Sequence, residues 1–378
     1  MKIGIVCYPT FGGSGVVATE LGKALALKGH EIHFITYNQP VRLDYLSSGL
    51  HFHQVQIQEY PLFEYQPYEL ALSSKMVAIV LKHNLDILHV HYAIPHAYAA
   101  FMAKQILKGQ GVDVKVVTTL HGTDITLVGS HPSYKTAVEF SINNSDVVTT
   151  VSNSLRKQTL ELFAINKEIK VIYNFIEIDK YPIIGSEDCQ RSSIAQKEER
   201  ILTHISNFRP VKRISDVIEI FYKVQQKIPS KLLLVGEGPD LTAARRQVKK
   251  YKIEEKVLFL GNSVEIEKIL CYTDVFLLPS QTESFGLAAL EAMAARSAVI
   301  SSQAGGLSEV NDHGKTGFLS PVGDTDDMAK HAIYMLEDFD RLQTFKNTAY
   351  EHSKKFSLEE ILPEYENIYD GLIKKNKS

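Results

Sequence analysis

The sequence predicts an α/β protein made of two doubly wound domains, each a parallel sheet with helices on both faces. Three observations support this prediction. Apolar runs of strand type alternate with helix-length segments along most of the chain. The alternation forms two series, separated by a charged and polar stretch at 183–200 that has little periodicity. Several strands end in glycine-rich or polar turns, which is where open parallel sheets bind ligands.

Composition narrows the possible functions. The 378 residues are enough for two domains, each with its own core. A net charge of -3 and a pI near 6.5 argue against nucleic acid as a main partner. No run of about 18 uninterrupted apolar residues is present to span a bilayer. The chain enters its first strand without a signal peptide, so a cytoplasmic location is expected.

The three cysteines support the same expectation. Cys7, Cys189 and Cys271 are widely spaced and odd in number. We therefore expect neither a disulfide framework nor a zinc site.

The first domain opens with a strand at 2–7, a glycine turn at 12–15, a helix at 16–28 and a second strand at 31–36. This is a βαβ unit with a glycine-rich loop after its first strand. The spacing is G-G-x-G, however, and no acid follows the second strand to bind a ribose. A dinucleotide site is therefore disfavoured, and the turn is left as either a phosphate contact or a plain tight turn.

The rest of this domain repeats the α/β pattern. Residues 40–75 read as irregular excursions of the kind that line a cleft. Further strands are predicted at 86–91, 114–120 and 147–151, and helices at 97–107, 133–143 and from 152 onward. Polar clusters follow these strands, including His121-Gly122-Thr123-Asp124. They should meet at one edge of the sheet.

The second series has the same character. Strands are predicted at 201–205, 231–235, 257–260, 275–278, 298–301 and 317–319, and helices at 215–227, after Asp240 and at 264–271. A basic loop, R-P-V-K-R, follows the first of these strands. We expect the last helix, at about 358–374, to pack back on the first domain.

The most informative stretch is 275–297. A strand ends at Pro279, and an Ala-rich helix is predicted to begin near Ser284. Glu283 and Glu291 then bracket the helix start, roughly 12 Å apart along a helix axis. The N–H groups of Phe285, Gly286 and Leu287 would suit a phosphate between them. Alternatively, the acids simply complement the helix dipole and bind nothing.

Together these segments resemble the retaining glycosyltransferases of the GT-B fold, the large family that includes glycogen and sucrose synthases. The resemblance covers essentially the whole chain. It is carried by G-G-S-G, by the basic loop, by E-S-F-G-L-A-A-L-E and by A-G-G-L-S-E-V, in that order. It implies two Rossmann-like domains facing across a cleft: 1–175, joined by the helix at about 358–378, for the acceptor, and 176–357 for the UDP-sugar.

The resemblance also implies roles for single residues. Glu291 would hold the ribose hydroxyls of UDP and Glu283 a hydroxyl of the donor sugar. His121 would meet the 6-hydroxyl of that sugar, unless it is a hydrogen-bonded core histidine. Lys212 and Arg209 would face the diphosphate. In many relatives an arginine stands where this chain has Asn207. The remaining donor contacts implied are Gly13, Ser284, Phe285, Gly286 and Leu287.

Within the family, C-Y-P-T-F-G-G-S-G, H-V-H-Y-A-I-P-H-A and T-T-L-H-G-T-D-I-T resemble the members that transfer N-acetylglucosamine from UDP-GlcNAc to L-malate, the first step of bacillithiol synthesis. Two carboxylates on malate need cationic or hydroxyl partners, for which Ser14, Lys75, Tyr92 and Thr123 are candidates. Lys75 reads equally as an exposed helical lysine.

Three other functions remain open: a relative with a lipid acceptor, a UDP-GlcNAc epimerase or hydrolase, and a non-enzymatic nucleotide-sugar sensor. No metal or other cofactor is expected, because Asp324-Thr325-Asp326 lies far along the chain from the phosphate-binding segments. A homo-oligomer is compatible with the sequence.

Overall fold

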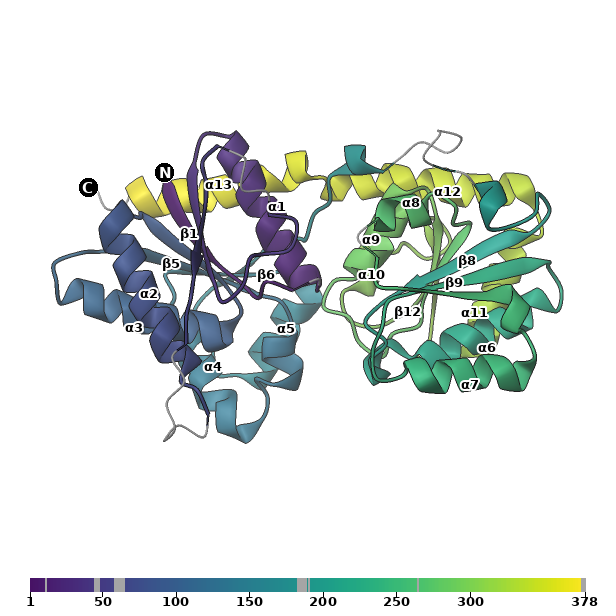
Figure 1. The fold of residues 1–378 in the computed structure, drawn as a ribbon, viewed down its shortest axis with the longest axis horizontal. Helices are drawn as coiled ribbons and strands as arrows, with labels where there is room; N and C mark the ends of the chain where they lie inside the picture. The colour runs from purple at the N-terminus through teal and green to yellow at the C-terminus, as the bar shows by residue number, and fades with distance from the viewer. Residues whose placement is uncertain are drawn as a thin grey trace. The chain divides into compact units, whose positions relative to one another are not determined.

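The structure, a computed structural model, describes residues 1–10, 12–43, 48–57, 65–181, 189, 191–263 and 265–374. The chain divides into two compact units. Unit 1 contains Met1–Asn174 together with Glu359–Ser378, and unit 2 contains Phe175–Leu358 (Figure 1). Among the described residues, no helix is both long enough and apolar enough to cross a membrane.

The described residues of unit 1 form a seven-stranded parallel sheet in the order β3-β2-β1-β4-β5-β6-β7. The strands are β1 (Lys2–Val6), β2 (Glu31–Thr36), β3 (Leu50–Gln54), β4 (Ile87–His91), β5 (Lys115–Leu120), β6 (Val147–Thr150) and β7 (Ile169–Val171). The helices are α1 (Gly13–Leu27), α2 (Tyr68–His83), α3 (Tyr98–Lys108), α4 (Pro132–Asn144), α5 (Asn153–Leu162) and α13 (Leu358–Lys374), with short turns η1 (Ala93–Ala97) and η2 (Thr123–Leu127). Central strands are buried on both faces, which explains their nearly continuous apolar sequences.

The described residues of unit 2 form a six-stranded parallel sheet in the order β10-β9-β8-β11-β12-β13. The strands are β8 (Arg200–Ile205), β9 (Ser230–Val235), β10 (Val257–Gly261), β11 (Val275–Leu278), β12 (Ala298–Ser302) and β13 (Gly317–Ser320). The helices are α6 (Ile214–Gln225), α7 (Leu241–Tyr251), α8 (Ile266–Leu270), α9 (Leu287–Ala294), α10 (Leu307–Val310), α11 (Thr325–Leu336) and α12 (Phe339–Ser353), with the turn η5 (Pro210–Lys212). Apolar faces of α6 and α11 share one core with the strands.

Both sheets have a topological switch point. In unit 1 the strand order reverses between β1 and β4, and in unit 2 it reverses between β8 and β11. The loops that leave these strand pairs run in opposite directions, so a crevice opens at the carboxyl ends of the strands. The G-G-S-G turn, the basic loop and the turn that carries Glu283 follow β1, β8 and β11, whereas the H-G-T-D and A-G-G-L segments follow the neighbouring strands β5 and β12.

Unit 1 is completed by a helix that follows unit 2 in the sequence. α13, yellow in Figure 1, contains Pro363 and packs its apolar face on the sheet of unit 1. The Tyr369 hydroxyl lies 2.7 Å from His89 Nδ1 on β4, and both side chains are fully buried. The chain therefore leaves unit 1 after residue 174 and re-enters it at residue 359.

Three local predictions differ from the structure. Residues 40–75 are not wholly irregular, because β3 and the start of α2 lie within them, although 44–47 and 58–64 are outside the described residues. The helix after β11 begins at Leu287, not near Ser284, because Gly286 adopts a left-handed conformation (φ 101°) and caps it. The predicted helix at 264–271 spans Ile266–Leu270, and Val264 is outside the described residues.

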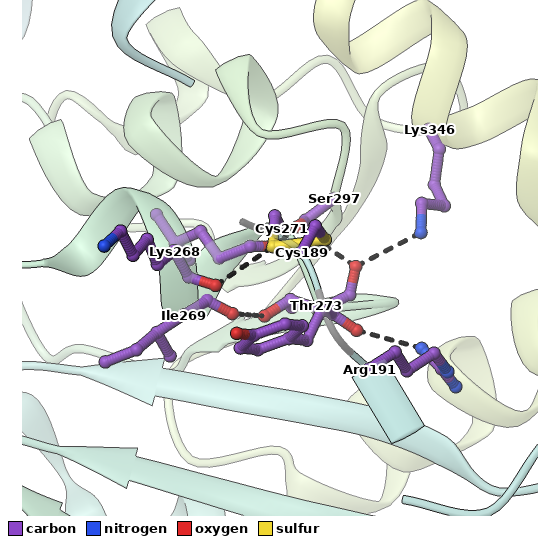
Figure 2. The surroundings of a disulfide bond; sticks show 10 residues. Cys189, Arg191, Lys268, Ile269, Cys271, Thr273, Ser297 and Lys346 are labelled. Carbon is purple, nitrogen blue, oxygen red and sulfur yellow. Dashed lines mark hydrogen bonds between the residues drawn. A yellow bond between two sulfur atoms is a disulfide. The ribbon is translucent and has the colours of Figure 1, made fainter. Parts of the chain in front are cut away.

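The cysteine prediction was also wrong. Cys189 and Cys271, 82 residues apart in sequence, form a disulfide (Figure 2). Cys7 is a buried free thiol. Beside the disulfide, Arg191 donates to the Tyr272 carbonyl and to Asp274 Oδ2, each at 2.9 Å. Disulfides are rare in reducing compartments. The expected cytoplasmic location thus loses one of its supports and stays a prediction.

Candidate active site

The loop between β11 and α9 holds Glu283 in a fixed position. Its Oε1 accepts hydrogen bonds from Ser280 Oγ at 2.8 Å and from Lys212 Nζ at 2.5 Å. The Glu283 and Lys212 side chains are 13% and 22% exposed, so the ion pair is shielded but still reachable by a ligand. Lys212 comes from η5, after β8, and the pair therefore joins the two sides of the switch point.

A glycine turn after β12, at Gly305 and Gly306, packs against the backbone of this loop. The Gly306 N–H donates to the Glu283 carbonyl at 2.9 Å. A Cβ on Gly305 would lie 2.0 Å from the Glu283 carbonyl oxygen, and one on Gly306 would lie 2.4 Å from that of Ser284. Only glycine permits this approach. The A-G-G-L segment thus packs directly against the backbone of Glu283 and fixes its position.

The start of α9 differs from the geometry predicted for the two acids. Glu283 and Ser284 lie in the loop before the Gly286 cap, and Glu291 lies half-buried one turn into the helix. The 12 Å spacing along one helix axis therefore does not apply. The Phe285 side chain is 2% exposed and packs on Phe356, so only its backbone could meet a ligand. The first N–H groups of α9, including that of Leu287, lack an acceptor within the helix and suit an anion.

The basic loop leaves β8 beside this turn. Asn207 and Arg209 are exposed, and Lys212 is half-buried. The Gln281 N–H donates to the Val211 carbonyl at 2.8 Å, which connects the basic loop to the loop that holds Glu283. The structure therefore brings Lys212 to Glu283 but leaves Arg209 pointing at solvent. A phosphate bound over the basic loop would face the charges of both Lys212 and Arg209.

In unit 1 the corresponding switch point joins the start of α1 to the end of β4. Ser14 Oγ lies 2.7 Å from the Tyr92 hydroxyl. Tyr92 has a positive φ of 87°, which turns its ring across the sheet edge to a centroid distance of 5.2 Å from His121. Burial raises the pKa of Tyr92 above its usual value, so its hydroxyl keeps its proton. Gly13, the exposed first residue of α1, lies next to Ser14.

His121 lies in a row of buried imidazoles. Its Nε2 is 2.8 Å from His91 Nδ1, and the His121 side chain is nearly buried. Burial lowers the pKa of His121 to about 3, and it lowers the pKa of His96 to about 4. These side chains are neutral near pH 7. His121 can therefore exchange a hydrogen bond with a sugar hydroxyl but does not supply a positive charge.

Asp124 is a residue that the sequence analysis did not assign. Its Oδ2 accepts from the Ala93 N–H at 2.8 Å, and its Oδ1 accepts from the Gly122 N–H at 2.9 Å and the His121 N–H at 3.3 Å. Burial raises the pKa of Asp124 to about 6. The carboxylate ties the loop after β4 to the loop after β5, so it positions His121. Its place in the H-G-T-D segment was the available signal.

The last two predicted acceptor residues are placed differently. Thr123 is exposed at the start of η2, one residue from Asp124. Lys75 is half-buried on α2, and its charge acts on His53 of β3. Among the described residues, no hydrogen bond or ion pair joins Lys75 to Ser14, Tyr92 or Thr123. Tyr68, at the start of the same helix, does reach the ring of His96, at 6.4 Å between centroids.

Comparison with known proteins identifies the family of the chain. Two family models match the chain: Glycosyltransferase Family 4 over residues 11–180, and Glycosyl transferases group 1 over residues 186–352. An N-acetyl-alpha-D-glucosaminyl L-malate synthase of Bacillus anthracis is 47% identical over 379 residues, which is 100% of this chain and 99% of that protein.

Solved structures show the same architecture. Sucrose-phosphate synthase of Thermosynechococcus elongatus has a TM-score of 0.82 at 21% identity, over 99% of this chain and 100% of that one. HepE of Anabaena, in complex with UDP and glucose, has a TM-score of 0.83 at 21% identity, over 98% and 100%. The chain therefore belongs to the group 1 and family 4 glycosyltransferases, retaining enzymes of the GT-B fold that take their sugar from a nucleotide.

Proposed function

We propose that the protein transfers N-acetylglucosamine from UDP-GlcNAc to the hydroxyl of L-malate, with retention, and releases UDP. The observation that carries the proposal is the 47% identity, over the full length of both chains, to a protein named for that synthesis. Except for Lys75 on α2, the site residues quoted above follow strands at or next to the two switch points, which supports the proposal.

Unit 2 is proposed to bind the donor. Glu291 on α9 would accept hydrogen bonds from ribose hydroxyls, and Glu283 would accept one from the sugar. Lys212, Arg209 and the first N–H groups of α9 would face the diphosphate. Asn207, Ser284 and the backbone of Phe285 and Gly286 lie on the same loops. Positive charge and helix N–H groups at that point would stabilise the charge that develops on the leaving phosphate.

Unit 1 is proposed to bind the acceptor and the reactive face of the sugar. The hydroxyls of Ser14, Tyr92 and Thr123, with the Lys75 ammonium as a weaker candidate, would hold the malate carboxylates. His121, positioned by Asp124, would contact the sugar. Gly13 has no Cβ, which would let a ligand approach the start of α1 closely.

The chemistry proposed is front-side transfer. The bond from the anomeric carbon to the phosphate oxygen breaks, and the malate hydroxyl oxygen bonds to that carbon on the same face. The hydroxyl proton passes to the leaving phosphate oxygen. The protein then supplies position and charge stabilisation, and neither Glu283 nor Glu291 acts as a nucleophile.

The experiment is UDP release from UDP-GlcNAc with a panel of small hydroxy acids, with products identified by mass. L-Malate should stimulate release at least tenfold over D-malate, lactate or no acceptor. Full UDP release without any acceptor would favour a hydrolase or epimerase. Transfer only with lipid vesicles present would favour a lipid acceptor, and either result would overturn the proposal.

A further inference from the structure

A cluster of four histidines and one glutamate lies on β2, β3 and the end of α2. We refer to Glu31, His33, His51, His53 and His83 as the histidine cluster. Parallel pairing sets His33 opposite His51, and His53 follows two residues along the same strand. The ring of His33 lies 4.6 Å from that of His51, 5.1 Å from that of His53 and 4.4 Å from that of His83, between centroids. None of these residues is used by the proposed transfer.

Hydrogen bonds within the histidine cluster already order its central ring. His33 Nε2 lies 3.0 Å from Glu31 Oε1, and since a carboxylate only accepts, this nitrogen carries the proton. His33 Nδ1 therefore presents its lone pair, 2.9 Å from His53 Nε2. A carboxylate behind an imidazole in this way is the usual second shell of a metal-binding histidine.

His83 and His53 also have features expected of metal ligands. His83 Nε2 is buried and has no hydrogen-bond partner among the described residues. Burial, and then the neighbouring imidazoles, lower the pKa of His53 to about 4, and burial lowers that of His33 to about 4. Neutral imidazole is the form that binds a metal ion.

We propose that His33, His53 and His83 form a binding site for a divalent transition-metal ion such as Zn²⁺. One ligand nitrogen from each residue lies within 4.8 Å of the others. Three nitrogens about 2.0–2.1 Å from a common ion would need shifts of about an ångström or less. His53 would take its other tautomer, and the ion would replace the proton that it shares with His33. An all-imidazole set favours zinc, nickel, copper or cobalt over magnesium or calcium.

The position of the histidine cluster suggests a bracing role. β3 is the edge strand of the sheet, and His83 lies at the end of α2, a separate element. An ion held by His33, His53 and His83 would cross-link β2, β3 and the end of α2. Binding only to the folded protein raises its stability. At an ion concentration 100 times the dissociation constant, unit 1 should melt about 5 °C higher or more.

The test uses full-length protein without a histidine tag, stripped with a chelator and dialysed. Zn²⁺ is titrated in competition with a chromophoric chelator, and Co²⁺ is titrated while its visible absorption is recorded. We expect one equivalent of Zn²⁺ bound with a sub-micromolar dissociation constant. His53→Gln and His83→Gln should each weaken binding at least tenfold, and Glu31→Gln should weaken it about 10- to 100-fold through the second shell.

His131→Gln is the matched control, because His131 is an exposed histidine of unit 1 outside the histidine cluster. It should bind Zn²⁺ like the unchanged protein. The buried His33 is left intact so that folding is not at issue, and circular dichroism checks each variant. Less than 0.2 equivalents bound, or equal losses in His53→Gln and His131→Gln, would overturn the proposal. The readouts do not use transferase activity, so the proposed function is tested separately.

Discussion

Lys212 and Glu283 are each other's partner: the ammonium nitrogen lies 2.5 Å from Glu283 Oε1, across 71 residues of sequence. Removing either group leaves the other partly buried and without its opposite charge. The two residues should therefore behave as one unit when they are changed.

We expect Glu283→Gln and Lys212→Met each to lower kcat/KM for UDP-GlcNAc by about 100- to 1,000-fold, the cost of removing a group that stabilises developing charge. The double variant should be only slightly worse than either single one. The exposed pair Lys268–Glu265, at 2.7 Å, supplies controls in Lys268→Met and Glu265→Gln, which should stay within twofold. Losses that multiply in the double variant would show that the two groups act independently.

Gly305→Ala should impair catalysis through the loop beneath Glu283. Its Cβ would collide with the Glu283 carbonyl oxygen, and its φ of +56° is costly for alanine. We expect kcat/KM to fall about 100-fold if the Glu283 carboxylate moves by about 1 Å. Gly314→Ala is the control, because Gly314 has φ +77° but open space around its Cβ. It should lose about 1 kcal/mol of stability and no activity. Equal activity losses in both variants would contradict the role given to Gly305.

Tyr92→Phe and Ser14→Ala test the acceptor side. Each removes one hydroxyl of the 2.7 Å pair. We expect the KM for malate to rise about tenfold in either variant, the effect of one or two lost hydrogen bonds to a charged group, with the KM for UDP-GlcNAc changing less than twofold. Steady-state kinetics with each substrate varied separately make the measurement. A rise confined to the KM for UDP-GlcNAc would show that these hydroxyls bind the donor and not malate.

Unit 1 should lose stability in mild acid. His89, His91, His96 and His121 are buried, and burial lowers the pKa of each, to about 3 for His89 and His121. Their folded-state pKa values lie below that of an unfolded histidine. Their stabilising contribution is therefore complete above about pH 6.5 and is lost as the pH falls from there toward 4.

Asp124 acts in the opposite direction, because its pKa is raised to about 6 and protonation between about pH 6 and 4 favours the folded state. The stability gained by protonating this one carboxylate is smaller than the stability lost at the four histidines. We expect the Tm to fall by about 10 °C or more between pH 7 and pH 5. His96→Gln should flatten the curve. A Tm that is constant down to pH 5 would mean that these imidazoles are hydrated in the folded protein.

The disulfide gives a fifth prediction. Closing a loop of 82 residues lowers the entropy of the unfolded chain by an amount worth about 4 kcal/mol. Cys271→Ser should melt several degrees lower than the oxidised protein. Thiol titration in denaturant should find one reactive thiol, from Cys7, before reduction and three after it. Three thiols before reduction would show that the pair is reduced in the purified protein.

Much of the fold could be predicted from the sequence. Buried parallel strands are apolar throughout, and glycines and polar residues mark their ends, so the alternation of strands and helices is readable locally. Strand β7 and edge strand β3 were missed. The sequence of β3 is L-H-F-H-Q, and its two histidines are not typical of a strand. Their contacts with His33 and His83 appear only in the folded structure.

The sequence motifs identified residues of the candidate site, but they did not predict which of these residues contact one another. Glu283, Lys212 and His121 were found through motifs, whereas the pairing of Lys212 with Glu283 depends on which strands become neighbours in the sheet. Asp124 was missed because its partners are backbone N–H groups, which leave no trace in a pattern of side chains. Cys189 and Cys271 were misjudged for a related reason: their spacing of 82 residues carries no local signal.

The placement of α13 has a consequence for how the protein is made. Unit 2 is one continuous segment, whereas unit 1 needs the Tyr369 hydroxyl that lies beside His89. Domains fold as units during synthesis. All of unit 2 leaves the ribosome before α13 does, so unit 2 can reach its native state while the sheet of unit 1 still lacks a covering helix. The half of the protein that is synthesised first is thus completed last.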